Sequence, residues 1–169
     1  RVAELHLALS QSKDLKDFAP EPFSLHYQRS LFSSMLALVR ETSDNIQQFK
    51  ESLPDGEKAA VENLLNRKND LIAIFKKIYS KKLDVVKIRT HGMLGLGQVL
   101  LTGKDVAIHD FRGIPTRRQS ETRLKRSPLG DVAFMIRSYY YAGYEGFLTT
   151  AHVGKDEIKY LLSYADLWI

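Results

Sequence analysis

One stretch of this sequence, from residue 91 to residue 111, limits the possible folds more than any other. Two apolar runs, residues 98–102 and 106–111, flank the turn sequence Gly103-Lys104-Asp105. Short apolar segments joined by a few residues that include glycine are typical of a β-hairpin. Residues 85–90 have the composition of a further short strand. We therefore predict a small β-hairpin that belongs to a three-stranded sheet.

The predicted hairpin would hold two polar side chains beside a glycine-rich loop. Gln98 lies at the start of its first strand, and Asp110 lies at the end of its second strand. The preceding loop contains Gly92, Gly95 and Gly97, and glycine allows a backbone to turn tightly and to approach a ligand closely. This end of the hairpin is therefore the candidate functional site.

Apolar residues recur at three- and four-residue spacing through most of the remaining chain, which predicts amphipathic helices. The predicted helices span residues 1–11, 25–52, 57–79, 128–147 and 155–169. Ser24 can cap the second helix, and Ser127 can cap the fourth. The short break at residues 53–56 makes the second and third helices an antiparallel pair. Long helices around a small sheet predict an α+β fold, mostly α, in a single domain over residues 1–169.

The composition narrows the functional classes. The chain has 169 residues and no cysteine, and no apolar run reaches the length of about 20 residues that spans a membrane, so we expect a cytoplasmic protein with no membrane partner. The net charge of +5 comes from residues 112–126, which hold six basic residues and one acidic residue. This segment is either a solvated loop or a surface for phosphate or an acidic partner. Nucleic acid is not expected, because no aromatic residues interleave with these arginines.

Four short motifs stand out in the sequence: His91-Gly92, residues 96–100, Asp110-Phe111 and Arg126-Ser127-Pro128-Leu129. Together they resemble the maltokinases, a carbohydrate-kinase family related to aminoglycoside phosphotransferases and protein kinases and sometimes fused to trehalose synthase. The resemblance implies the helical C-terminal lobe of a kinase-like fold, without its N-terminal nucleotide-binding lobe. It also implies that His91 supports the loop backbone, and that Gln98 and Asp110 are residual ligands for magnesium.

The chain departs from this family where the chemistry should occur. Met93 stands where the family has an aspartate, the expected base, and Leu94 and Gly95 replace an aromatic residue and a histidine. Arg112 and Ile114 stand where the family usually has acidic residues. A thioether cannot accept a proton from a sugar hydroxyl, and an arginine beside a metal position repels magnesium. The sequence therefore predicts a protein that is not an enzyme and needs no cofactor.

The replaced residues are of types that are enriched at protein interfaces. Our leading hypothesis is an inactive maltokinase-like lobe, diverged or engineered, whose changed face binds a partner protein. The predicted binding face consists of Met93, Leu94, Gly95, Arg112, Ile114, Arg117, Arg118 and Gln119. Self-association through an exposed apolar face is another option. The alternatives are a fragment of an ATP- and magnesium-dependent maltokinase that needs an N-terminal lobe, and a helical fragment without a ligand.

Overall fold

The computed structural model describes residues 1–12, 14–115 and 118–149, together with residues 154, 156, 157, 159, 160 and 163. The chain forms two compact units, and each is described by itself. One unit comprises Arg1–Glu21 and Val86–Ile169, and the other comprises Pro22–Val85. The single domain over residues 1–169 stays a prediction.

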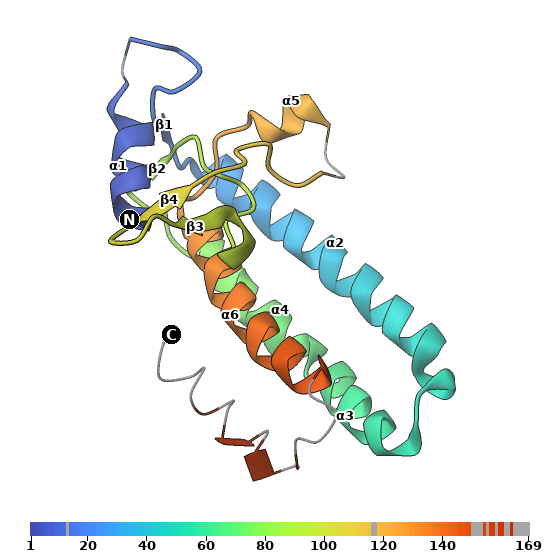
Figure 1. The fold of residues 1–169 in the computed structure, drawn as a ribbon. Helices are drawn as coiled ribbons and strands as arrows, with labels where there is room; N and C mark the ends of the chain where they lie inside the picture. The colour runs from blue at the N-terminus through green and yellow to red at the C-terminus, as the bar shows by residue number, and fades with distance from the viewer. Residues whose placement is uncertain are drawn as a thin grey trace. The chain divides into compact units, whose positions relative to one another are not determined.

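The unit formed by Pro22–Val85 is a helical hairpin (Figure 1). The long helix α2 (Leu25–Phe49) ends in the 3₁₀ turn η1 (Lys50–Ser52), and the chain returns through α3 (Asp55–Asn66), α4 (Lys68–Lys76) and η2 (Lys77–Tyr79). Ser24 caps α2, because its Oγ accepts a hydrogen bond of 3.2 Å from the Tyr27 amide. The predicted cap and the predicted antiparallel pair are both confirmed.

The prediction of one continuous helix over residues 57–79 is wrong. The helix is interrupted at Arg67, which has φ −85° and ψ 4° and separates α3 from α4. Residues 66–70 are all polar, and both Asn66 and Asn69 are weak helix formers. No apolar side chain in this segment packs to hold the helical backbone, so the hydrophobic periodicity on either side does not guarantee continuity.

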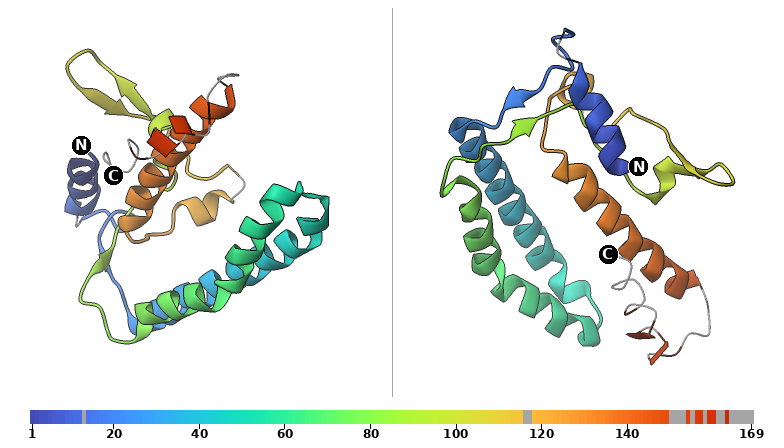
Figure 2. Two further views of the ribbon diagram at one scale, coloured as in Figure 1. Left: turned by 90° about the horizontal axis from the view of Figure 1, so that it is seen from below. Right: turned by 90° about the vertical axis from the view of Figure 1, so that its left-hand side faces the viewer.

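The other unit carries the hairpin and the candidate site (Figure 2). Its elements, among the described residues, include α1 (Val2–Gln11), β2 (Val86–Lys87), η3 (Leu96–Gln98), β3 (Val99–Leu101), β4 (Val106–Ile108), α5 (Gln119–Thr122) and α6 (Leu129–Thr149). Ser127 caps α6, since its Oγ accepts from the Leu129 amide at 3.3 Å. Most of the helix predicted over residues 155–169 lies outside the described residues.

The β-hairpin is confirmed, but the third strand pairs elsewhere. Strands β3 and β4 are antiparallel, and the connecting turn uses Gly103 at φ +91°. The segment predicted as a third strand gives β2 (Val86–Lys87), which pairs with β1 (Glu21–Pro22). The next residue, Ile88, exchanges backbone hydrogen bonds of 3.0 and 2.9 Å with Arg126. These long-range partners occupy the segment's hydrogen-bonding groups, so a sheet with the hairpin does not form. The class α+β, mostly α, is confirmed.

Three consecutive tyrosines on α6, Tyr139-Tyr140-Tyr141, are exposed, although residues at helical spacing more often belong to a core. These side chains on α6 are 40%, 37% and 60% exposed. Tyr141 instead lies against Arg137, whose guanidinium carbon is 4.7 Å from the ring centroid. Within the part of the chain that the structure describes, no helix is long and apolar enough to cross a membrane.

Candidate functional site

The loop at the candidate site is held by one buried carboxylate. Asp131, in the first turn of α6, has no exposed surface and accepts hydrogen bonds from the amides of His91 at 2.9 Å and Gly92 at 2.8 Å. His6 on α1 places Nε2 3.0 Å from the same carboxylate. Asp131 therefore fixes the backbone at the start of the loop. Sequence reasoning missed this role, although an acidic residue in the first turn of a helix capped by Ser127 was a usable signal.

His91 joins this loop to the segment that follows β4. Its buried ring lies 2.8 Å from the His109 carbonyl oxygen through Nε2, and its centroid is 4.8 Å from that of Phe111. The prediction that His91 supports the backbone is confirmed. The loop and the Asp110-Phe111 segment are thus positioned together.

The predicted metal ligands Gln98 and Asp110 are brought close by the hairpin register. Val99 pairs with Ile108, and the His109 amide donates to the Gln98 carbonyl at 3.0 Å. However, the Gln98 side chain is already engaged, because its Oε1 accepts from the Gly95 amide at 3.1 Å. This hydrogen bond closes the loop, so the Gln98 Oε1 atom faces the Gly95 amide and not an open metal site.

The carboxylate of Asp110 is occupied by an arginine. Arg112 donates through Nε to Oδ1 at 2.5 Å and through a terminal nitrogen to Oδ2 at 3.0 Å. The hydrogen bond from Arg112 holds the pKa of Asp110 below its usual value, and the same contact raises the pKa of Arg112. Asp110 itself has a positive φ of 64°, a strained conformation for a non-glycine residue. Both carboxylate oxygens are therefore taken by a cation of the chain itself.

This donor set does not fit magnesium, the ion that a kinase fold implies. Mg²⁺ binds through carboxylates and water oxygens in a near-octahedral arrangement. Here the candidate donors are one amide, bonded to Gly95, and one carboxylate, paired with Arg112. Among the described residues, no group of three or more histidine or acidic side chains is arranged to hold a metal.

The three replaced residues of the loop do not share one surface. Met93 is half-buried and lines a pocket of about 320 Å³ whose wall includes Phe134 and Tyr141. Leu94 is fully buried, so the prediction that it lies on an exposed binding face is wrong. Gly95 packs on α6, where an added Cβ would come within 3.2 Å of the Ser138 Cβ. Alternate residues of a tight loop face opposite sides, which the linear sequence does not reveal.

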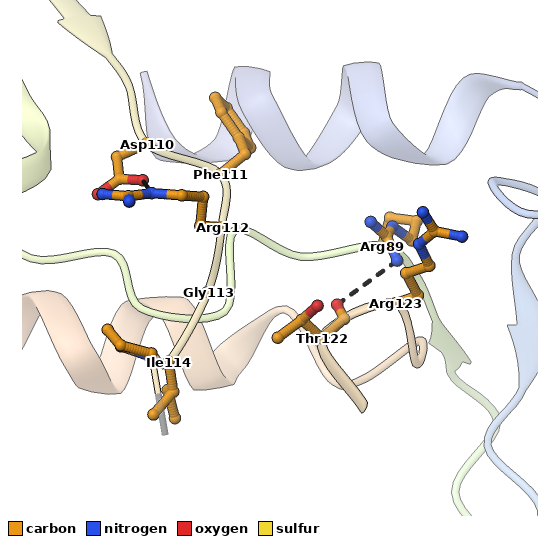
Figure 3. A pocket seen from close by; sticks show the side chains of 9 residues that line it. Arg89, Asp110, Phe111, Arg112, Gly113, Ile114, Thr122 and Arg123 are labelled. Atoms are coloured by element: carbon orange, nitrogen blue, oxygen red, sulfur yellow. Dashed lines mark hydrogen bonds and ion pairs between the residues drawn. The ribbon is translucent and has the colours of Figure 1, made fainter. Parts of the chain in front are cut away.

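Arg112 and Ile114 lie together at a second pocket, of about 530 Å³ (Figure 3). Its wall also includes Arg89, Asp110, Phe111, Gly113, Pro115, Thr122 and Arg123. The remaining predicted face residues fall around α5. Arg118 is exposed just before that helix, Gln119 begins it, and Arg117 lies outside the described residues. Arg123 belongs to the basic segment identified in the sequence, but Arg89 was missed because it lies 34 positions earlier, a separation that gives no local pattern.

Several solved structures have a similar fold. Two crystal forms of a glucosamine kinase, and a glucosamine kinase in complex with glucosamine, ADP and inorganic phosphate, each superpose with a TM-score of 0.68 at 18% sequence identity. The chain has a kinase-like fold. The kinase-like lobe is matched over 97% of its length but spans only 36–37% of those chains. No model of a known protein family matches the sequence. The likeness supports the fold, and it does not point to maltokinase specifically.

Proposed function

We propose that this kinase-like lobe does not catalyse phosphoryl transfer and that its changed surface binds a partner protein. The observation that carries the proposal is the two-point ion pair between Arg112 and Asp110. A metal ion at Asp110 would have to displace a guanidinium that is covalently part of the same turn. The guanidinium of Arg112 is tethered beside Asp110, so its local concentration is high and it competes strongly with a free cation for the carboxylate.

The position of Met93 supports the same proposal. The maltokinase resemblance assigns a proton-accepting aspartate there, and a thioether cannot take that role. Loss of a positioned base alone costs on the order of 10²–10⁴ in rate. A methionine there also makes the neighbouring pocket more apolar, because Met93 lines it together with Phe134 and Tyr141. Methionine and aromatic side chains adapt well to a protein surface.

The surface around the second pocket has the composition of an interface. The Arg112 side chain is 87% exposed although its Nε and one terminal nitrogen donate to Asp110. Phe111, beside it, is 50% exposed. Arginine and aromatic residues dominate binding energy at protein interfaces. A partner protein is therefore the ligand that this surface favours. A cytoplasmic location is part of the proposal, and cell fractionation would test it.

Reversion of the changed residues tests the proposal. The triple variant Met93→Asp, Arg112→Glu and Ile114→Glu restores the residue types that the resemblance assigns. Cross-linking followed by mass spectrometry would identify a partner of the unmodified chain, and titration calorimetry with that purified partner would compare the two forms. We expect the triple variant to bind at least tenfold more weakly. A control variant, Lys104→Glu at the hairpin turn, makes the same charge change as Arg112→Glu alone and should bind normally. Equal binding by all three forms would contradict the proposal.

The second candidate is a fragment of an ATP-dependent maltokinase that transfers phosphate to maltose. Two observations favour it: the kinase-like fold, and the order of His91, Gln98 and Asp110 along the motif. Under this reading Gln98 and Asp110 would bind magnesium after Arg112 moves away. Incubation of the chain with ATP, Mg²⁺ and maltose, and detection of maltose 1-phosphate, decides between the candidates. Product above the level of a protein-free control would support the enzyme and overturn the first proposal.

A further inference from the structure

The pocket that contains Arg112 has a charge imbalance that the ion pair with Asp110 does not explain. Three segments far apart in the sequence line it: residue 89, residues 110–115 and residues 122–123. Figure 3 shows the Arg112–Asp110 pair on one side of the pocket and the guanidinium groups of Arg89 and Arg123 on the other. All of these residues belong to the same compact unit, so their arrangement is set by its fold.

The lining side chains carry three positive charges and one negative charge. Asp110 is bonded through both oxygens to Arg112, which leaves Arg89 and Arg123. Arg89 makes a long hydrogen bond of 3.4 Å to the Thr122 carbonyl and lies 5.8 Å from the Phe18 ring centroid. Within the ranges that the structure describes, no carboxylate lies within ion-pair distance of Arg89 or Arg123. The pocket therefore holds a net charge of about +2.

The carboxylate of Glu21 pairs with two lysines, Lys87 and Lys125, that are each two positions along the chain from a pocket arginine. Glu21 lies 2.9 Å from both Lys87 and Lys125, and these two contacts lower its pKa, so that it stays ionised and paired. Two like charges that line one pocket without a counter-charge destabilise the empty state. Binding of an anion removes that cost and adds hydrogen bonds, so the pocket should prefer anionic ligands.

We propose that Arg89 and Arg123 form a binding site for a phosphate monoester. A phosphate monoester carries about −1.5 to −2 charges at pH 7, which matches the charge of the pocket. The guanidinium fork donates two parallel hydrogen bonds to phosphate oxygens, a geometry that favours phosphate over a simple point anion. The pocket volume of about 530 Å³ leaves room for the group that bears the phosphate, against Phe111, Ile114 and Pro115. This site is independent of the proposed role of Met93.

Titration calorimetry at low salt tests the site directly. The probes are glucose 1-phosphate, a peptide with a single phosphoserine, and the same peptide with serine. We expect both phosphorylated probes to bind and the serine peptide to show no heat. A stronger signal from the peptide would identify a phosphorylated protein as the source of the phosphate, and a stronger signal from the sugar phosphate would identify a metabolite. Absence of heat from both phosphorylated probes would overturn the proposal.

Charge-matched variants separate the pocket from general electrostatic attraction. Arg123→Gln removes a side chain with no ion pair among the described residues, so the fold should tolerate it. We expect it to weaken phosphate binding about tenfold, since hydrogen bonds to charged groups contribute strongly. Arg40→Gln removes the same charge from an exposed position on α2 and should bind normally. Arg89→Lys keeps the charge but loses the fork, and should show an intermediate loss. Equal weakening by Arg123→Gln and Arg40→Gln would overturn the site, whatever the outcome of the partner experiments.

Discussion

Two parts of the candidate site, only some twenty residues apart along the chain, differ in how they are held. The loop that begins at His91 is anchored by buried groups, because Asp131 accepts both loop amides and the His91 ring meets the His109 carbonyl. The turn after Asp110 is exposed, and its main side-chain contact is the pair with Arg112. His91 and Gly92, whose amides are held by Asp131, match the predicted motif, whereas Arg112 in the exposed turn departs from it.

The difference has a physical cause. A buried polar group must keep its partner, since an unsatisfied amide or carboxylate in the interior costs about 1–3 kcal/mol or more. An exposed side chain exchanges protein contacts for water at little cost, so its identity is set by what it binds. The buried partners of His91 and Gly92 therefore constrain the start of the loop more than the exposed side chain of Arg112 is constrained. Each of the following predictions tests that contrast, in order of decreasing expected effect.

Loss of the buried anchor should be the most damaging change. Asp131→Ala removes the acceptor for two buried amides and the partner of His6, so we expect unfolding to become easier by about 3–5 kcal/mol. Urea denaturation followed by circular dichroism measures this. Asp70→Ala removes an exposed acidic residue from the first turn of α4 and should cost under about 1 kcal/mol. Similar losses for both variants would end the distinction between the two parts of the site.

Two leucines close in sequence sharpen the contrast between buried and exposed positions. Leu94→Ala creates a cavity at a side chain with no exposed surface, and we expect a loss of about 2–4 kcal/mol. Leu101→Ala acts on a side chain that is 87% exposed on β3, and should change stability by less than about 0.5 kcal/mol. Thermal and urea unfolding of both variants provide the measurement. A small effect at Leu94 would mean that its burial does not stabilise the loop.

The bridge between Glu21 and its two lysines should give a smaller, pH-dependent effect. Hydrogen bonds from Lys125 and Lys87 lower the pKa of Glu21, so its contribution is present above the ordinary carboxyl pKa and is lost as the pH falls through the lowered pKa. Glu21→Gln should therefore be about 0.5–1 kcal/mol less stable at pH 7, after allowance for the half-exposed carboxylate.

The two forms should converge in acid. Urea titrations of the unmodified chain and of Glu21→Gln at pH 7 and at about pH 3 measure the change. Glu62→Gln on the exposed side of α3 is the control, because it removes the same charge and Glu62 has one lysine contact of 3.5 Å. Gln28→Glu would not serve, because Gln28 is buried. A difference at pH 7 that persists unchanged in acid would contradict the assignment to ionised Glu21.

The exposed turn should show the smallest effect on stability and a clear effect on titration. Arg112→Ala frees the Asp110 carboxylate, so its pKa should rise toward the ordinary value of about 3.9. Because the pKa of Asp110 is lowered in the unmodified chain, the ion pair stabilises the fold at pH values above the ordinary carboxyl pKa. This stabilisation is lost as the pH falls through the lowered pKa. Carbon-detected NMR of the Asp110 carboxyl group follows both titrations. An unchanged pKa in Arg112→Ala, with Arg67→Ala as the control, would show that the pair does not form in solution.

Much of the fold follows from local patterns, and the exceptions share a cause. The caps at Ser24 and Ser127, the hairpin turn at Gly103 and the antiparallel helices all depend on neighbours within a few residues. The break at Arg67 was missed because periodicity reports which residues face the core and not whether the backbone is continuous. The exposure of Tyr139-Tyr140-Tyr141 does not follow from the sequence, because helical spacing defines a face without specifying what covers it.

The candidate site divides in the same way. The sequence identified His91, Gln98 and Asp110 from a motif and found the arginine at position 112, because these residues lie in two short segments. The sequence could not show that the side chain of Arg112 turns back onto Asp110, since the same residues in an extended turn would leave both groups free.

The amino-acid sequence alone determined most of the helices and the β-hairpin, because each depends on local spacing and on turn residues. Only the tertiary structure decided that Asp131 anchors the loop, that Leu94 is internal, and that Arg89 and Arg123 share a pocket. These features join segments that are tens of residues apart, and the free energy that brings such segments together comes from the whole fold.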